Sequence, residues 1–218
     1  KKSVVKTSGD KNPGTYYLYD GKTKKLQYLL ARADWLKSKD LARVEPFKFI
    51  NRDGVELYGY LTLPNGKTDK NLPLVVNPHG GPHGPRDYWQ FDWRAQAIAS
   101  QGYAVLQVNF RGSGGYGDKF EQAGYREWGG KIQHDIIDAT YWAISQGIAD
   151  KERICIYGGS FGAYSALQSA ILAPNLFKCT IGASGVYDLP LMYEDGDIPK
   201  WVYGKKYLSK AIGEEELN

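Results

Sequence analysis

From Val44 onward, short apolar runs alternate with longer segments whose apolar residues recur every three or four positions. The first pattern is typical of strands and the second of amphipathic helices. The predicted strands are 45–50, 56–63, 74–77, 104–109, 153–157 and 177–183, and the predicted helices are 91–101, 132–146 and 161–172. Strands that alternate with crossover helices favour an α/β fold, a mainly parallel sheet with helices on both faces.

The N-terminal part of the chain has a different pattern. Residues 15–30 contain two β-rich runs around the turn signal Asp20-Gly21, which predicts a hairpin. An isolated two-stranded hairpin is only marginally stable in water, so we expect it to belong to a larger sheet. The polar stretch 31–43 follows, and we place a boundary there: residues 1–43 form a hairpin and linker, and residues 44–218 form the main domain.

Composition and charge narrow the class of protein. Of the 218 residues, 42% are hydrophobic and 24% are charged, which is typical of a globular domain. The net charge of +4 comes from scattered basic residues, so we predict no nucleic-acid partner. No apolar stretch is long enough for a membrane span. We also predict neither a cofactor nor a metal ion.

The sequence leaves two features undecided: the targeting of the protein and the state of its two cysteines. The chain begins at Lys1 and residues 1–6 lack the apolar core of a signal peptide, so we expect it to be trimmed or cut from a longer protein. Localisation is therefore not predicted. Cys155 and Cys179 each lie in an apolar run without a second cysteine nearby. We interpret them as two buried free thiols, with a structural disulfide as the alternative.

The strongest chemical signal is Gly158-Gly159-Ser160-Phe161-Gly162, a G-x-S-x-G motif between a predicted strand and a predicted helix. A nucleophile elbow needs small residues at both ends because the strand turns sharply into the helix. This turn would expose the Ser160 hydroxyl and direct the helix N-terminus at a developing oxyanion. We predict that Ser160 is a catalytic nucleophile rather than an incidental serine in a glycine-rich turn.

A second loop supports this prediction. Pro78-His79-Gly80-Gly81-Pro82 follows the strand predicted at 74–77. Acyl transfer needs backbone N–H donors for the oxyanion, and H-G-G loops supply one of them. We assign the donors to the N–H of Phe161 and to that of Gly81 or Gly80. His79 is expected to support the rim of the site.

A third loop, 109–117, contains Gly112, Gly114 and Gly117 in the G-x-G-x-x-G spacing of dinucleotide-binding proteins. The next segment is interrupted by further glycines, so no clean helix would face a pyrophosphate. We interpret this loop as a structural part of the active-site rim. Arg111 is expected to pair with an acid such as Asp135, and Tyr116 to support the same rim.

These motifs, in this order, resemble the prolyl oligopeptidase family of serine peptidases, in particular its acylaminoacyl-peptidase-like and dipeptidyl-peptidase-like members. The similar stretches lie within residues 44–218 and include 52–54, 59–61, 77–82, 109–117, 127–129 with Asp135, and 158–162. The family usually has Gly where this chain has Ala163. The resemblance implies an α/β-hydrolase domain that acts on short peptides. It also implies that the hairpin at 15–30 is the end of a β-propeller.

One part of the expected machinery is missing. In α/β-hydrolases an Asp or Glu and then a His follow the serine. No histidine follows Ser160; His79, His83 and His134 all precede it. We read Asp188, Asp195 and Asp197 as rim or surface carboxylates. The hydrolase domain therefore looks incomplete at its C-terminus, and the expected partner is a downstream segment that carries the triad Asp and His, whether on the same parent protein or on a second chain.

The leading interpretation is a serine peptidase that cleaves short peptides through an acyl-enzyme on Ser160, and that is weakly active as this chain alone. A carboxylesterase of the same fold and a non-catalytic interaction fragment are the alternatives. The sequence does not define the peptide specificity.

Overall fold

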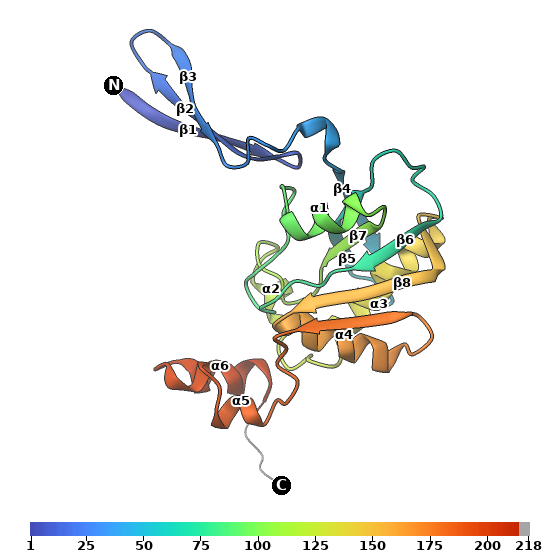
Figure 1. Cartoon of the computed structure of the whole chain (residues 1–218). Coiled ribbons are helices and arrows are strands. Elements are labelled where there is room, and N and C mark those ends of the chain that lie inside the picture. Colours follow the sequence, from blue (N-terminus) through green and yellow to red (C-terminus); the bar gives the residue numbers. More distant parts are fainter. Residues whose placement is uncertain (214–218) are drawn as a thin grey trace.

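The computed structural model describes residues 1–213, and the main domain is built on a six-stranded sheet in the order β4-β5-β7-β6-β8-β9 (Figure 1). The strands are β4 (Arg43–Ile50), β5 (Glu56–Leu63), β6 (Leu72–Val76), β7 (Ala104–Asn109), β8 (Ala149–Gly159) and β9 (Cys179–Ala183). β7, β6, β8 and β9 are parallel neighbours, as predicted, whereas β4 and β5 join antiparallel at one edge.

Helices cover both faces of this sheet, which confirms the predicted layers. α1 (Trp93–Ser100) packs on one face against β5 and β7. α3 (Lys131–Ser145) and α4 (Phe161–Leu172) pack against each other and against β8 on the other face (Figure 1). β7 lies between the two helix layers, and all six of its residues are buried. Its carboxyl end, like those of β6 and β8, points to the edge that carries the three sequence motifs.

The N-terminal residues form three antiparallel strands rather than the predicted two. β2 (Asn12–Asp20) and β3 (Lys25–Ala31) are the predicted hairpin, and β1 (Lys2–Gly9) pairs with β2 on its other side. This sheet projects from the main domain (Figure 1). The turn between β1 and β2 contacts the main domain, because the Asp10 carboxylate in that turn accepts a hydrogen bond of 3.1 Å from the Val44 N–H. The short 3₁₀ helix η1 (Ser38–Asp40) lies within the linker.

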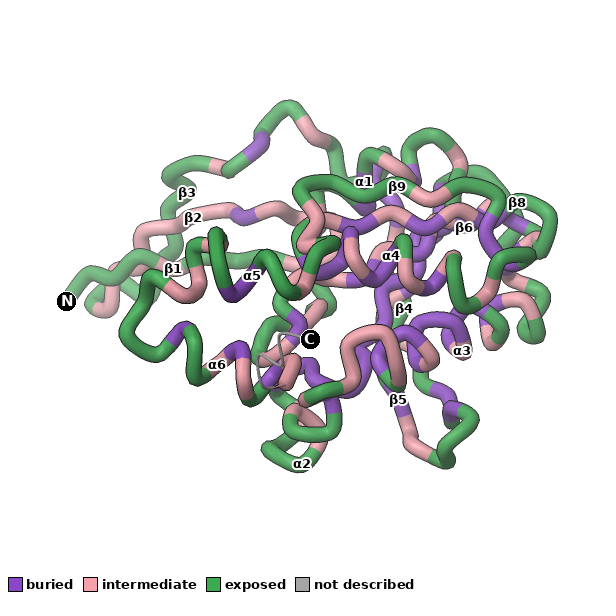
Figure 2. Tube along the Cα trace, turned by 90° about the horizontal axis from the view of Figure 1, so that it is seen from below, coloured by how far each residue is buried: buried purple, intermediate pink, exposed green. Residues whose placement is uncertain are grey.

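Short helices at the C-terminal end were not predicted. α5 (Leu191–Glu194), η2 (Ile198–Lys200) and α6 (Gly204–Ala211) enclose a small apolar cluster of Met192, Tyr193 and Leu208. α2 (Asp118–Gln122) follows the third loop. Figure 2 shows that the buried residues concentrate in the six-stranded sheet and its helices, whereas the N-terminal strands are almost entirely exposed or half-buried. No helix within residues 1–213 is long and apolar enough to cross a membrane.

The preferred interpretation of the two cysteines is wrong. Cys155 and Cys179 form a disulfide, with their Cα atoms 4.7 Å apart. They lie directly opposite each other on the parallel neighbours β8 and β9. Cys155 is partly buried and Cys179 is exposed. The apolar runs correctly indicated strands, but they did not indicate which strands are adjacent.

Candidate active site

The chain turns sharply at Ser160, between the end of β8 and the first residue of α4. Ser160 has φ 56° and ψ −126°, a conformation that a side chain with a Cβ atom rarely adopts. Its N–H donates to the carbonyl oxygen of Ala183 at the end of β9, at 3.0 Å, which anchors the turn to the neighbouring strand. Ser160 is exposed. The strained, accessible serine expected at a strand-to-helix turn is therefore present.

The two outer glycines of the motif are required by close backbone approach. A Cβ atom on Gly158 would overlap the carbonyl group of Gly162, the second residue of α4. A Cβ atom on Gly162 would overlap the carbonyl oxygen of Pro78. The second of these contacts crosses from α4 to the H-G-G loop, so the glycine spacing also brings these two motifs together.

The H-G-G loop lies beside Ser160. An ideal Cβ atom placed on Gly80 would be 3.7 Å from the Ser160 Cβ atom. A cavity of about 400 Å³ opens at this point, lined by Asn77, Pro78, His79, Gly80, Asp87, Asp92, Arg94, Gln107, Tyr157, Gly159, Ser160, Ala183 and Ser184. Within residues 1–213, the backbone N–H groups of Gly80, Gly81 and Phe161 donate no hydrogen bond. Of these residues, Gly80 lines the cavity.

The Phe161 side chain points into the core while its backbone begins α4. It is 1% exposed and contacts Phe110, Trp128 and Tyr164 through its ring, with the Trp128 centroid at 4.5 Å. This packing holds the first turn of α4 and therefore its N-terminal N–H groups.

None of the three histidines is placed as a base for Ser160. His79 lines the cavity, but Nδ1 lies 2.7 Å from the Gly80 carbonyl oxygen and Nε2 lies 2.8 Å from Ser113 Oγ. Burial lowers the pKa of His79 to about 4. Burial likewise lowers the pKa of His83 to about 4, and His83 packs between Tyr125 and Tyr207. His134 lies on α3 and lines a different cavity with Arg52.

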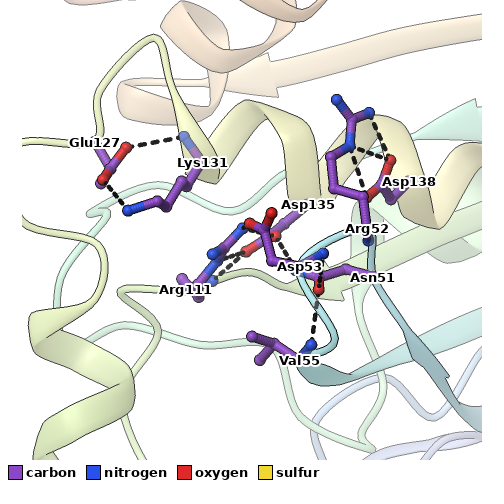
Figure 3. A network of polar contacts seen from close by, with 9 residues as sticks. All are labelled: Asn51, Arg52, Asp53, Val55, Arg111, Glu127, Lys131, Asp135 and Asp138. Atoms are coloured by element: carbon purple, nitrogen blue, oxygen red, sulfur yellow. Dashed lines mark hydrogen bonds and ion pairs between the residues drawn. The ribbon is translucent and has the colours of Figure 1, made fainter.

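The third loop is held by a buried ion pair (Figure 3). The Arg111 guanidinium donates to both Asp135 oxygens, at 2.9 and 2.7 Å, and also contacts Asp53 at 2.7 Å. Asn51 donates to the same Asp135 carboxylate at 2.7 Å. The predicted pairing of Arg111 with Asp135 is therefore confirmed. Burial raises the pKa of Asp135, and hydrogen bonds from Arg111 oppose this effect.

Tyr116 lies in the same loop and contacts Arg86, which follows the H-G-G loop. Its hydroxyl accepts hydrogen bonds from Arg86 at 3.0 Å and from Asn109 at 2.9 Å. The Arg86 guanidinium also lies over the Tyr116 ring, 4.5 Å from the centroid. Asp188, Asp195 and Asp197 are exposed, as predicted; the Asp188 carboxylate caps the N-terminus of α5 through the Leu191 N–H.

Asp87 was missed by sequence analysis. It lines the cavity with Ser160, and one of its carboxylate oxygens accepts a hydrogen bond from Gln107 at 3.1 Å. Its other oxygen is buried without a partner within the described residues. Burial, followed by the nearby Asp92 carboxylate, raises the pKa of Asp87 to about 7. No local motif marks this residue; only the folded loop brings it to the cavity. In the part of the chain that the structure describes, no group of three or more His, Cys, Asp or Glu side chains could hold a metal ion.

The sheet order, the helix layers and the turn at Ser160 define an α/β-hydrolase fold. The fold is shared with an acylaminoacyl peptidase from Pyrococcus horikoshii, with a TM-score of 0.82, 28% identity and coverage of 100% of this chain and 34% of that chain. A puromycin-hydrolyzing peptidase from Mycobacterium tuberculosis matches with a TM-score of 0.84 and 27% identity, covering 97% of this chain and 33% of that one.

The prolyl oligopeptidase family model matches residues 89–218, and this chain belongs to that family. Dipeptidyl aminopeptidase BIII from Pseudoxanthomonas mexicana is 37% identical over 218 residues, which is 97% of this chain and 31% of that protein. Acylamino-acid-releasing enzyme 1 from Oryza sativa subsp. japonica is 31% identical over 160 residues, 71% of this chain and 20% of that protein. The chain thus spans less than a third of the length of these curated relatives.

Proposed function

We propose that this chain supplies the nucleophile and the oxyanion-binding backbone of a serine peptidase that cleaves short peptides. The observation that carries the proposal is the position of Ser160: exposed, at a strained strand-to-helix turn, and beside an H-G-G loop in one cavity. The relatives named as aminopeptidase and acylamino-acid-releasing enzyme support a peptide substrate.

In this proposal Ser160 Oγ attacks the carbonyl carbon of the scissile amide, and its proton passes to a general base. The oxyanion that forms is bound by backbone N–H groups of Phe161 and the H-G-G loop. The leaving amine takes up a proton as the C–N bond breaks. Water then hydrolyses the ester on Ser160 by the same steps and restores the serine.

The base and the acid that orients it come from a downstream segment of the same parent protein or from a second chain. Support for this comes from the order of residues, because no histidine follows Ser160. The histidines that precede it are engaged with Ser113 or packed elsewhere. The base would reach Ser160 through the cavity that Asp87 and Arg94 line.

We also propose that residues 1–43 form the end of a β-propeller and its linker, and that the hydrolase domain begins at residue 44. The exposed outer strands of the β1–β3 sheet support this, since a small isolated sheet would leave much apolar surface in water. Val4 and Leu26, for example, are 65% and 56% exposed.

Labelling with a fluorophosphonate probe tests the nucleophile and the missing base together. A serine hydroxyl reacts slowly at neutral pH until a base accepts its proton. The 218-residue chain alone should therefore label slowly, and the chain joined to its natural downstream segment should label faster by about 10⁴-fold or more, the effect of triad members in serine proteases.

Ser160→Ala should abolish labelling of the longer protein, and Ser184→Ala, at an exposed serine in the same cavity, should leave it. Persistent labelling of Ser160→Ala would exclude Ser160 as the nucleophile. Fast labelling of the isolated chain would place the base within these residues, and His79, His83 and His134 would then be replaced one at a time.

A further inference from the structure

The third loop packs backbone to backbone against residues 84–85, which follow the H-G-G loop. The Gly84 N–H donates to the Gly112 carbonyl oxygen at 3.3 Å, and the Gly114 N–H donates to that of Pro85 at 3.2 Å. A Cβ atom on Gly114 would overlap the carbonyl group of Gly84. The glycines that imitate a dinucleotide fingerprint are therefore explained in part by this close contact between two loops.

The third loop is anchored firmly on its other side. The Arg111 N–H and guanidinium both bind Asp135, which is fully buried on α3. Asn51, in the β4–β5 turn, donates to Asp135 Oδ1, the oxygen that also accepts from the Arg111 guanidinium (Figure 3). Because buried, fully hydrogen-bonded charge pairs resist displacement, the residues that follow Arg111 have a defined position.

Ser113 is one of those residues, and it contacts His79 directly. Its side chain is fully buried, and Oγ lies 2.8 Å from His79 Nε2. The other ring nitrogen, Nδ1, lies 2.7 Å from the Gly80 carbonyl oxygen, which can only accept. Nδ1 therefore carries the proton, and Nε2 accepts from the Ser113 hydroxyl. The ring is also stacked on Phe110, with centroids 4.1 Å apart.

These contacts determine the direction of two peptide groups. In a trans peptide the C=O and N–H bonds point in opposite directions. The Gly80 carbonyl points to His79, so the Gly81 N–H of the same peptide points away from the ring. The preceding carbonyl, that of His79, faces α4, since it would lie 3.2 Å from a Cβ atom on Gly162. The Gly80 N–H therefore points away from α4.

We propose that His79 and Ser113 are positioning residues that orient the Gly81 N–H as the second oxyanion donor. The chain of contacts runs from Asp135 through Arg111 and the third loop to Ser113, His79 and the Gly80 carbonyl. Gly81, rather than Gly80, is the donor that pairs with Phe161. This inference rests on the proposed serine peptidase function.

Steady-state kinetics of the full-length protein on a peptide p-nitroanilide tests this inference. Removing one oxyanion donor from a serine protease lowers kcat by about 10²–10³-fold. His79→Leu, which keeps bulk but loses both ring nitrogens, should lower kcat by about 100-fold with KM changed less than about twofold. Ser113→Ala, which leaves His79 in place, should lower kcat by about 10-fold.

The conservative variants separate positioning from folding. In His79→Asn the amide nitrogen occupies the place of Nδ1 and can donate to the Gly80 carbonyl, so it should recover most of the kcat that His79→Leu loses. A peptidyl trifluoromethyl ketone, whose adduct carries an oxyanion, should bind each impaired variant more weakly in proportion to its kcat. Ser169→Ala, at a buried serine on α4 whose hydroxyl has no partner within the described residues, should leave kcat unchanged.

Unchanged kcat in Ser113→Ala and His79→Leu would overturn the inference, as would equal losses in His79→Asn and His79→Leu when both remain folded by circular dichroism. Ser160→Ala distinguishes this failure from failure of the proposed function. If Ser160→Ala is inactive while the His79 and Ser113 variants keep full kcat, only the positioning role is wrong. If Ser160→Ala keeps its activity, the proposed function itself is wrong.

Discussion

The carbonyl oxygen of Pro78 occupies the space that a Cβ atom on Gly162 would need. This contact joins the first turn of α4 to the loop after β6. It keeps the serine turn and the H-G-G loop in register, and so it makes the glycine at the end of G-x-S-x-G a requirement of tertiary packing as well as of the turn.

Gly162→Ala should therefore destabilise the protein and impair the site. Overpacking of this kind costs about 1–3 kcal/mol in the free energy of unfolding, and displacement of the H-G-G loop should slow fluorophosphonate labelling of the full-length protein. Gly159→Ala is the matched control, because a Cβ atom there would lie 3.7 Å from the Ala183 carbonyl oxygen, an ordinary contact distance. Equal losses in the two variants would contradict the packing argument.

Asp135→Asn should destabilise the protein far more than Asp53→Asn. Both carboxylates bind Arg111, but the Asp135 side chain is 0% exposed and that of Asp53 is 41% exposed. Loss of a buried partner leaves an uncompensated charge and costs about 3 kcal/mol or more, whereas water replaces an exposed partner. Urea unfolding, followed by tryptophan fluorescence, measures the free energy of unfolding of both variants. A larger loss for Asp53→Asn would show that the exposed pair holds the loop.

Reduction of the Cys155–Cys179 disulfide should lower stability. The crosslink closes a loop with a sequence separation of 24, for which chain entropy predicts about 3 kcal/mol. The denaturant midpoint of the full-length protein should therefore fall in the presence of reductant. The Cys155→Ser/Cys179→Ser variant should have the lower midpoint with or without reductant. Free-thiol titration that finds both cysteines reduced in the untreated native protein would contradict the disulfide.

Asp87 should make stability fall as pH rises from about 4 to about 7. Its pKa is raised from the ordinary 3.8 to about 7 in the folded state, so over this range the folded protein holds a proton that the unfolded chain has lost. Asp87→Asn removes the cost of ionising this buried carboxyl group and keeps an oxygen that can accept from Gln107. The Tm difference, variant minus wild type, should be higher at pH 8 than at pH 5 by roughly 5–10 °C, because the two pKa units between pH 5 and the folded-state pKa correspond to about 3 kcal/mol.

Scanning fluorimetry at the two pH values measures this difference. Asp34→Asn, at an exposed carboxylate near the N-terminal sheet, controls for the general effect of removing one negative charge. A Tm difference for Asp87→Asn that is the same at both pH values would show that the Asp87 carboxyl is not perturbed by the cavity.

The sequence alone determined the elements that are long or strongly apolar, and the local part of the site. β5, β7 and α4 have the predicted bounds, since their patterns come from contact with one or two covered faces. The strand β1 and the helix α2 were missed because neither has a buried residue, and α5 was missed because it is only four residues long. The helix α6 was also missed, although Gly204, Leu208 and Ala211 are buried at helical spacing. Ser160 and the H-G-G loop were recognised because the turn chemistry of each lies within five consecutive residues.

The tertiary structure alone decided every feature that depends on which strands are neighbours. β6 lies between β7 and β8, although it precedes both in the chain, and this order brings the loop after β6 against Ser160. The adjacency of β8 and β9 pairs Cys155 with Cys179. The hydrogen bond between Ser113 and His79 likewise joins loops that follow different strands. Asp87 lies in the loop after β6 and accepts a hydrogen bond from Gln107 on β7. Such pairings are set by the packing of the whole sheet, which local periodicity does not encode.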